Sequence, residues 1–165
     1  MGSVMPSSHQ LVDSMLDDLP WETANTVVEL GAGTGAVTEG IVQRLGAQSH
    51  FICFEFDAEL HAALAQKYPQ IHMAYDALEL QATLQQHGER AADIIISSLP
   101  FANFSNAEQT KLITSISASL ADNGEFVLYQ YTRQLEPLLK RHFAHIEQSY
   151  VLQNVPPAFV YRCTH

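Results

Sequence analysis

The sequence is poor in basic residues. Only eight of its 165 residues are Lys or Arg, against 18 Asp or Glu, and the formal net charge is −10. Because nucleic acids are held by cationic side chains, this balance opposes tight nucleic-acid binding. Residues 1–125 carry a net charge of −12, whereas residues 126–165 carry +2. We therefore expect no nucleic-acid partner. We expect membrane contact only as a weak, peripheral one through Arg133, Lys140 and Arg141, for which a solvated helix face is the simpler interpretation.

Other common features are also missing. No apolar run approaches the roughly 20 residues that span a bilayer, and no secretory signal opens the chain. Pro6 stands where N-myristoylation requires Ser or Thr. The eight His and two Cys residues show neither HExxH nor CxxC spacing, which predicts no metal site. These absences predict a soluble, cytoplasmic protein in which Cys53, inside an apolar run, is a buried free thiol.

Strand-like and helix-like stretches alternate along the chain, which predicts one α/β domain over residues 1–165 with a doubly wound, mostly parallel sheet. The predicted strands cover residues 26–30, 51–55, 71–73, 92–97, 125–131, 146–153 and 159–163. Helices are predicted from Ser8 to just before Pro20, after Gly35, and over residues 57–68, 78–86, 105–120 and 134–143. Pro156-Pro157 between the last two extended runs predicts a hairpin-like connection and an antiparallel strand at the sheet edge.

The most informative segment is Glu29-Leu30-Gly31-Ala32-Gly33-Thr34-Gly35, between a predicted strand and a predicted helix. Glycines are needed where the backbone turns tightly and a ligand approaches it closely. The spacing GxGxG, rather than GxGxxG, favours an adenosine-methionine ligand over a dinucleotide. Glu55 ends the second strand, where a carboxylate can accept both ribose hydroxyls, and Asp76 follows the third, where it can accept the adenine amino group. An ordinary tight turn with two surface acids is the alternative.

This segment resembles motif I of the class I S-adenosylmethionine-dependent methyltransferases. The resemblance implies a Rossmann-like fold and S-adenosyl-L-methionine as the cofactor. It also implies that Glu55 takes the ribose and that Asp76 and Ala77 face the adenine. Phe56 would pack on the adenine face, with plain core packing as the alternative. The methionine end would be held by Glu29, Gly31, Ala32, Gly33 and Gly35.

The fourth predicted strand ends in Ser98-Leu99-Pro100-Phe101, a position that faces the departing methyl group in class I methyltransferases. Pro100 stops the strand, and we expect it to leave backbone carbonyls free to accept a hydrogen bond from an amine. An aromatic face would hold a partly methylated, cationic amine. Alternatively, Phe101 and Phe104 are core residues under a loop. Enzymes that methylate adenine N6 carry Asn or Asp where this chain has Ser98, which argues against rRNA adenine methylation.

Almost the whole chain resembles the bacterial phospholipid N-methyltransferases. This resemblance implies N-methylation of phosphatidylethanolamine or a related head group, with Ser7 and Ser8 near the cofactor's carboxylate and Tyr131 near the amine. Helix capping is the alternative role for the two serines, and packing the alternative for Tyr131. The segments that carry the resemblance are Gly2–Ser8, Glu29–Gly35, Tyr68-Pro69, Asp76-Ala77, Ser97–Phe101, Gln130-Tyr131 and Asn154–Ala158.

One feature departs from that family. Its members carry an additional amphipathic, basic N-terminal segment that docks on membranes, and this chain begins after the position expected for it. A small-molecule amine methyltransferase without a membrane anchor is therefore the second hypothesis. A non-catalytic S-adenosylmethionine-binding protein is the third, and the intact glycine, ribose and adenine positions argue against it.

Overall fold

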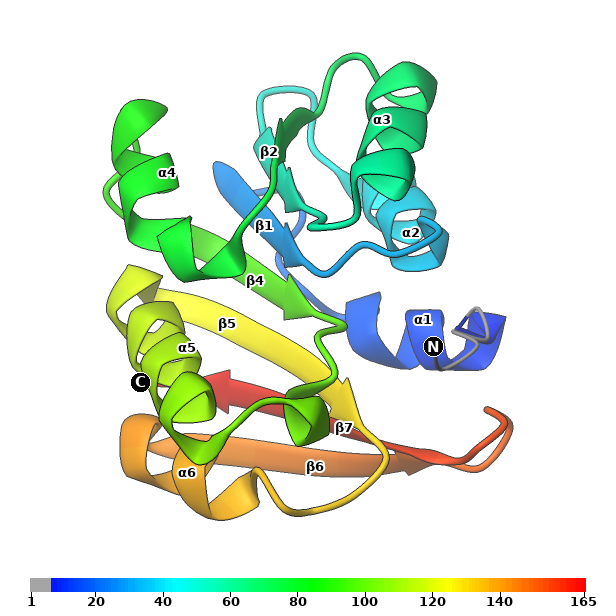
Figure 1. Cartoon of the computed structure of the whole chain (residues 1–165), viewed down its shortest axis with the longest axis vertical. Coiled ribbons are helices and arrows are strands. Elements are labelled where there is room, and N and C mark those ends of the chain that lie inside the picture. Colours follow the sequence, from blue (N-terminus) through cyan, green and yellow to red (C-terminus); the bar gives the residue numbers. More distant parts are fainter. Residues whose placement is uncertain (1–6) are drawn as a thin grey trace.

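A computed structural model describes residues 7–165. They form a seven-stranded sheet in the order β3-β2-β1-β4-β5-β7-β6, with helices on both faces (Figure 1). The strands are β1 (Thr26–Leu30), β2 (His50–Phe54), β3 (His72–Ala74), β4 (Ala92–Ser97), β5 (Leu120–Gln130), β6 (His145–Val151) and β7 (Ala158–Thr164). The helices are α1 (His9–Leu16), α2 (Ala36–Arg44), α3 (Ala58–Lys67), α4 (Leu80–Gln86), α5 (Asn106–Ser119) and α6 (Glu136–His142), with 3-10 turns η1 (Ala77–Glu79) and η2 (Phe101–Asn103). The predicted doubly wound α/β sheet is confirmed.

The central strands place the site. Every residue of β1 is buried, because β1 has a strand on either side and helices on both faces. It pairs in parallel with β2 and β4, so that Glu29 lies opposite Cys53 on one side and Ile96 on the other. Since parallel strands end at the same edge of a sheet, the loops that follow β1, β2 and β4 meet there. We call this the carboxyl edge.

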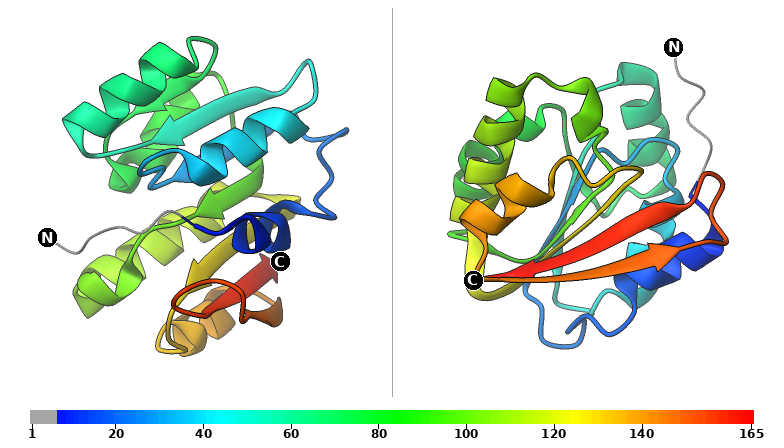
Figure 2. Two further views of the ribbon diagram at one scale, coloured as in Figure 1. Left: turned by 90° about the vertical axis from the view of Figure 1, so that its right-hand side faces the viewer. Right: turned by 90° about the horizontal axis from the view of Figure 1, so that it is seen from below.

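Two helical layers enclose two apolar cores (Figure 2). Helices α1, α2 and α3 cover one face, and α4, α5 and α6 cover the other (Figure 1). Successive residues of β1 point to opposite faces, so Val27 belongs to the α1 side and Val28 to the α5 side. The α1 core contains Met15 of α1 and Ile41 of α2, whereas Ile113 of α5 lies in the other core.

The predicted helix caps are present, and one strand differs from its prediction. Ser8, Asp57 and Ser105, at the predicted starts of their helices, cap α1, α3 and α5, and Ser105 forms a capping box with Glu108. Strand β5 begins at Leu120, five residues before the predicted start at residue 125, so that residues 122–124 lie inside it. The reason is a register shift against β4 between Ala92 and Ile94, which accommodates the extra residues of β5 as a bulge.

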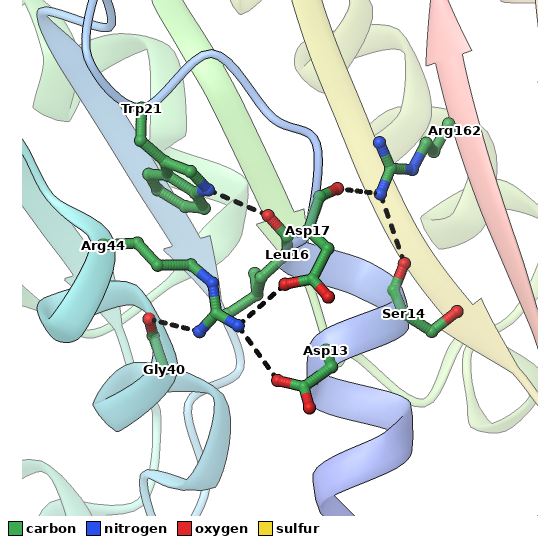
Figure 3. A network of polar contacts seen from close by, with 8 residues as sticks. All are labelled: Asp13, Ser14, Leu16, Asp17, Trp21, Gly40, Arg44 and Arg162. Carbon is green, nitrogen blue, oxygen red and sulfur yellow. Dashed lines mark hydrogen bonds and ion pairs between the residues drawn. The ribbon is translucent and has the colours of Figure 1, made fainter.

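Helix α1 is shorter than predicted, and two arginines fix its position (Figure 3). Arg44 of α2 pairs through Nη2 with Asp13 and Asp17, at 2.9 Å in each case. From β7, Arg162 donates to the carbonyl oxygens of Ser14 and Asp17. Arg162, one of the basic residues of the segment 126–165, is therefore engaged in holding α1.

The C-terminal strands form a hairpin with the predicted antiparallel strand. Strand β7 is antiparallel to both its neighbours, β5 and β6, and β6 is the outermost strand on this side. Pro156 and Pro157 lie in the connection, as predicted. The connection reaches the start of α1, where the side-chain oxygen of Asn154 accepts a hydrogen bond from the Ser8 amide at 3.0 Å. In the part of the chain from residue 7 onward, no helix is both long and apolar enough to cross a membrane.

Candidate functional site

The glycine loop joins β1 to α2 at the carboxyl edge. Gly31, Gly33 and Gly35 have φ values of 77°, 58° and 94°, in the left-handed region that favours glycine. A Cβ on Gly31 would stand 2.8 Å from Leu99 Cδ2, and one on Gly35 would stand 2.7 Å from Leu64 Cδ2. A Cβ on Gly33 would meet nothing within 4 Å. Two glycines thus permit close packing inside the protein, whereas the space over the third is open to a ligand.

Glu55, directly after β2, closes the loop from the side. Its Oε2 accepts a hydrogen bond from the Gly33 amide at 2.5 Å, and its Oε1 accepts one from the Asp57 amide at 2.9 Å. The side chain is nearly buried. Because each carboxylate oxygen can accept two hydrogen bonds, Glu55 keeps capacity for two further donors. The structure thus places the predicted ribose acid beside the glycine loop.

Glu29 is a fully buried carboxylate at the end of β1, ahead of the loop. Its Oε2 accepts hydrogen bonds from Thr38 Oγ1 at 2.7 Å and Cys53 Sγ at 3.5 Å, while Oε1 is buried without a partner among the described residues. Burial raises the pKa of Glu29 to about 7, against the opposing effect of the two hydrogen bonds. An unpartnered buried oxygen costs folding free energy unless a donor reaches it, and an ammonium group would supply that donor.

A cavity of about 390 Å³ opens between the ends of β2 and β3 and helix α5. This volume is in the range of roughly 300–1,000 Å³ that small-molecule sites have. The cavity brings together five residues predicted for the site: Gly31, Phe56, Asp76, Ala77 and Leu99. Its other walls are Phe54, Tyr75, Leu78, Phe104, Glu108 and Leu112.

The side chains at the cavity suit a flat heterocycle with an amino group. Phe56 is 77% exposed, so the alternative of plain core packing is wrong. Tyr75 is stacked on His61 with ring centroids 3.7 Å apart. Asp76 accepts a hydrogen bond from the Leu78 amide through Oδ1 at 2.9 Å, which fixes the carboxylate at the cavity wall. Aromatic faces and a fixed acceptor are what an adenine ring requires.

The segment after β4 differs from its prediction. The carbonyl oxygen of Leu99 accepts hydrogen bonds from Gln130 Nε2 at 3.1 Å and the Phe101 amide at 2.9 Å. The Phe101 carbonyl accepts from Gln109 Nε2 at 2.7 Å and the Phe104 amide at 3.0 Å. Since a carbonyl oxygen has two lone pairs, neither has one left for a substrate amine. The expectation of free carbonyls is wrong at both positions.

Phe101 itself packs in the core, which corrects the expectation of a ring facing the amine. It meets Phe104 edge to face, with ring centroids 6.0 Å apart, and Phe104 lines the cavity. Pro100 is exposed. The Ser98 amide donates to the Leu30 carbonyl at 2.9 Å, which ties this segment to the glycine loop, and the Ser98 hydroxyl is buried without a partner in the described structure.

The residues that line the cavity do not include Ser7, Ser8 and Tyr131. Ser8 accepts a hydrogen bond from the Leu11 amide at 3.1 Å, so its hydroxyl serves as a helix cap, the alternative that the sequence left open. Ser7 directly precedes it, and the rest of that opening segment lies outside the described residues. Tyr131 is 47% exposed at the end of β5, with its ring 5.8 Å from that of Tyr129. Burial and the neighbouring Tyr129 raise the pKa of Tyr131 above its usual value.

The cations proposed for membrane contact are largely engaged. Glu136 pairs with Arg133 Nε at 3.0 Å and with Lys140 Nζ at 2.9 Å. These hydrogen bonds and charges lower the pKa of Glu136 to about 2. Arg141 is exposed on the same helix. Because Glu136 neutralises part of their charge, the three cations together present less net positive charge to a membrane than their number suggests.

Comparison with known proteins identifies the family. Residues 27–124, from β1 into β5, match the family described as "Methyltransferase domain". The chain is also 31% identical over 169 aligned residues to an "Ornithine lipid N-methyltransferase" from Singulisphaera acidiphila, covering 99% of this chain and 88% of that protein. The chain belongs to the S-adenosylmethionine-dependent methyltransferases.

Solved structures confirm the class I fold of this methyltransferase. A precorrin-6y C5,15-methyltransferase from Geobacter metallireducens GS-15 has a TM-score of 0.73 at 12% identity, covering 99% of this chain and 91% of the other. A 16S rRNA N2 G1207 methyltransferase from T. thermophilus, solved with AdoMet and guanosine, has a TM-score of 0.71 at 21% identity, covering 99% of this chain and 44% of the other. At these identities the likeness extends to the fold alone. The cofactor of the methyltransferase is S-adenosyl-L-methionine.

Several residues that shape the candidate site were not predicted from the sequence. Thr38 and Cys53 bind the Glu29 carboxylate from α2 and β2, and no local motif marks them. Gln130 fixes Leu99 from β5 across 31 residues of chain. Tyr75 directly precedes Asp76, the acid predicted to bind the adenine, and this position is the one sequence feature that could have pointed to Tyr75. The others depend on which strands become neighbours, which no short segment encodes.

Proposed function

We propose that this methyltransferase transfers a methyl group to the amine nitrogen of a lipid head group of the ornithine lipid type. The similarity to a protein named "Ornithine lipid N-methyltransferase" over 99% of this chain carries the proposal. Phosphatidylethanolamine is the second acceptor to test, because its head group also ends in a primary alkyl amine. We do not extend the proposal to nucleic acid, which the formal net charge of −10 opposes.

We assign each part of the cofactor to residues that can still accept a hydrogen bond or that line the cavity. We assign the ammonium group to Glu29, whose Oε1 is buried without a partner among residues 7–165. We assign the ribose hydroxyls to Glu55 and the adenine to the cavity beside Asp76, Ala77 and Phe56. Gly31, Ala32, Gly33 and Gly35 form the loop below it. When bound, S-adenosyl-L-methionine supplies an electrophilic methyl group on a sulfonium.

The acceptor side is assigned to Ser98, Leu99 and Pro100, with Tyr131 at the end of β5. Methyl transfer is an in-line displacement, so the protein must align a neutral nitrogen with the methyl group. The Ser98 hydroxyl, buried without a partner, can accept a hydrogen bond from the amine. The raised pKa of Tyr131 keeps its phenol protonated near neutral pH, so Tyr131 serves in orientation rather than as a base. We expect the amine to lose its proton to solvent before the transfer.

A comparison of acceptors tests the proposal. The purified protein is given labelled S-adenosylmethionine with ornithine lipid, with phosphatidylethanolamine, and with soluble primary amines in turn. The proposal predicts methylation of ornithine lipid at the highest kcat/KM. Preference for a soluble amine would instead support a small-molecule methyltransferase, and cofactor binding without transfer to any acceptor would support a binding protein.

A further inference from the structure

The turn of the C-terminal hairpin carries apolar side chains that no core or cavity uses. We call residues 152–157, which join β6 to β7, the hairpin tip. Leu152 is 67% exposed there and Val155 is 70% exposed. Tyr131 and Tyr150, at the ends of β5 and β6, are about half exposed. Four of the seven exposed large apolar side chains of the described structure therefore lie in this corner, and the other three line the cavity.

The hairpin tip and the strand ends that flank it in β6 and β7 are also uncharged. Residues 148–161 contain no Asp, Glu, Lys, Arg or His, in a chain whose net charge is −10. An acidic protein is repelled by an anionic lipid surface, and the repulsion is smallest where the protein carries no carboxylates. The residues of the hairpin tip therefore favour an apolar contact over an electrostatic one.

The hairpin tip lies at the same edge of the sheet as the proposed acceptor side. Tyr131 follows Gln130, which is paired with Phe159 of β7. Asn154 of the tip binds the Ser8 amide through its side-chain oxygen, and its side-chain amide donates to the Pro156 carbonyl at 2.8 Å. In Figure 1 the turn between β6 and β7 projects beyond the end of β5, and in the right-hand view of Figure 2 it lies at the far end of the hairpin, next to α1.

We propose that the hairpin tip docks this methyltransferase on the lipid bilayer that holds its acceptor. Leu152 and Val155 enter the acyl region, and Tyr131 and Tyr150 lie at head-group level, where tyrosines are enriched at membrane surfaces. A second copy of the chain is a poorer occupant, since a stable dimer buries about 800 Å² on each partner and a six-residue turn offers far less. The choice of a bilayer rests on the proposed function, and the docking itself is measured independently of it.

Vesicle flotation of the full chain tests the docking. The vesicles contain equal parts of phosphatidylcholine and phosphatidylethanolamine and are used at physiological salt, where weak electrostatic binding is screened. The variant Leu152→Asp/Val155→Asp should bind at least about tenfold more weakly, because two apolar contacts are lost. The matched control Ala47→Asp/Gln48→Asp adds the same charge to an exposed turn between α2 and β2, at the opposite edge of the sheet, and should bind as the wild type does.

Activity separates docking from function. On a short-chain amine lipid dissolved as monomers, the hairpin variant should match the wild type, whereas on the same head group in vesicles it should be slower. Cofactor affinity verifies folding, and Leu152→Ser/Val155→Ser replaces the Asp pair if that pair does not fold.

Equal vesicle binding by wild type and hairpin variant, or no binding by the wild type, overturns the inference. A change from dimer to monomer on mutation also overturns it, in favour of a second copy. Hairpin-dependent vesicle binding without methylation of any lipid amine supports docking and refutes the proposed function.

Discussion

The Gly33 amide donates a hydrogen bond to Glu55 Oε2 at 2.5 Å, across 22 residues of chain. This contact joins the loop after β1 to the end of β2, two segments that parallel pairing brings to the same edge of the sheet. The acid thereby shapes the glycine loop and still has lone pairs for further donors. Glu55 is therefore expected to act on the cofactor both directly and through the loop.

Replacing Glu55 with Ala should weaken S-adenosylmethionine binding by about 1–3 kcal/mol, the usual cost of leaving polar partners without a hydrogen bond. Isothermal titration calorimetry with the cofactor and its demethylated product measures the change. Glu59→Ala is the control, because Glu59 is an exposed acid in the first turn of α3. Unchanged affinity in Glu55→Ala would remove the ribose assignment.

Replacing Gly33 with Ala should separate ligand contact from backbone strain. Gly33 and Gly88 both have positive φ, and a Cβ on either would meet nothing within 4 Å of the protein. Both Ala variants should therefore lose a similar free energy of unfolding, on the order of 1 kcal/mol. Only Gly33→Ala should weaken cofactor binding, because its Cβ occupies the space over the loop. Equal cofactor affinity in the two variants would show that the ligand does not approach Gly33.

Glu29 should make the cofactor-free protein less stable as the pH rises from about 4.5 to about 7. Its pKa is raised from 4.5 to about 7 by burial, so across this window the folded carboxyl keeps a proton that the unfolded chain releases. The free energy of unfolding then falls with increasing pH, by roughly 3 kcal/mol over the window. Denaturant unfolding at several pH values measures this slope.

The variant Glu29→Gln should lose most of that slope. Thr38→Val should instead extend the fall in the free energy of unfolding to higher pH, because the Thr38 hydrogen bond stabilises the ionised form of Glu29. A slope that persists unchanged in Glu29→Gln would assign the pH dependence to other groups.

An alkyl amine acceptor should give a rate that rises toward alkaline pH. Such an amine has a pKa near 10 in solution and attacks only when deprotonated. A flat rate between neutral pH and about pH 9, measured where methyl transfer limits turnover, would contradict an alkyl amine acceptor.

Tyr131→Phe should lower kcat by about tenfold or less and leave cofactor affinity unchanged, because loss of an orienting hydrogen bond costs about 1 kcal/mol.

The sequence predicted the sheet and the placement of the glycine loop beside Glu55 better than it predicted the segment after β4. Glycine spacing, strand ends and caps are local, so the loop at Gly31–Gly35, Glu55 and the Ser105–Glu108 capping box could be predicted from short segments. The Leu99 and Phe101 carbonyls could not, because Gln130 and Gln109 reach them from other elements. The pairing of Arg133 and Lys140 with Glu136 follows i,i+3 and i,i+4 spacing, in agreement with the solvated helix face that the sequence indicated. The bulge in β5 depends on how β5 pairs with β4, and the residues of β5 alone do not show that pairing.

The most direct test of the account locates the transferred methyl group. The full chain is incubated with S-adenosylmethionine bearing an isotopically labelled methyl group and vesicles that contain ornithine lipid, and tandem mass spectrometry of the extracted lipid identifies the labelled fragment. The account predicts labelled methyl groups on the terminal amine nitrogen of the head group, and loss of the signal in Glu55→Ala at low cofactor concentration. Label on oxygen or carbon of the lipid, or no labelled lipid while a soluble amine is methylated, would contradict it.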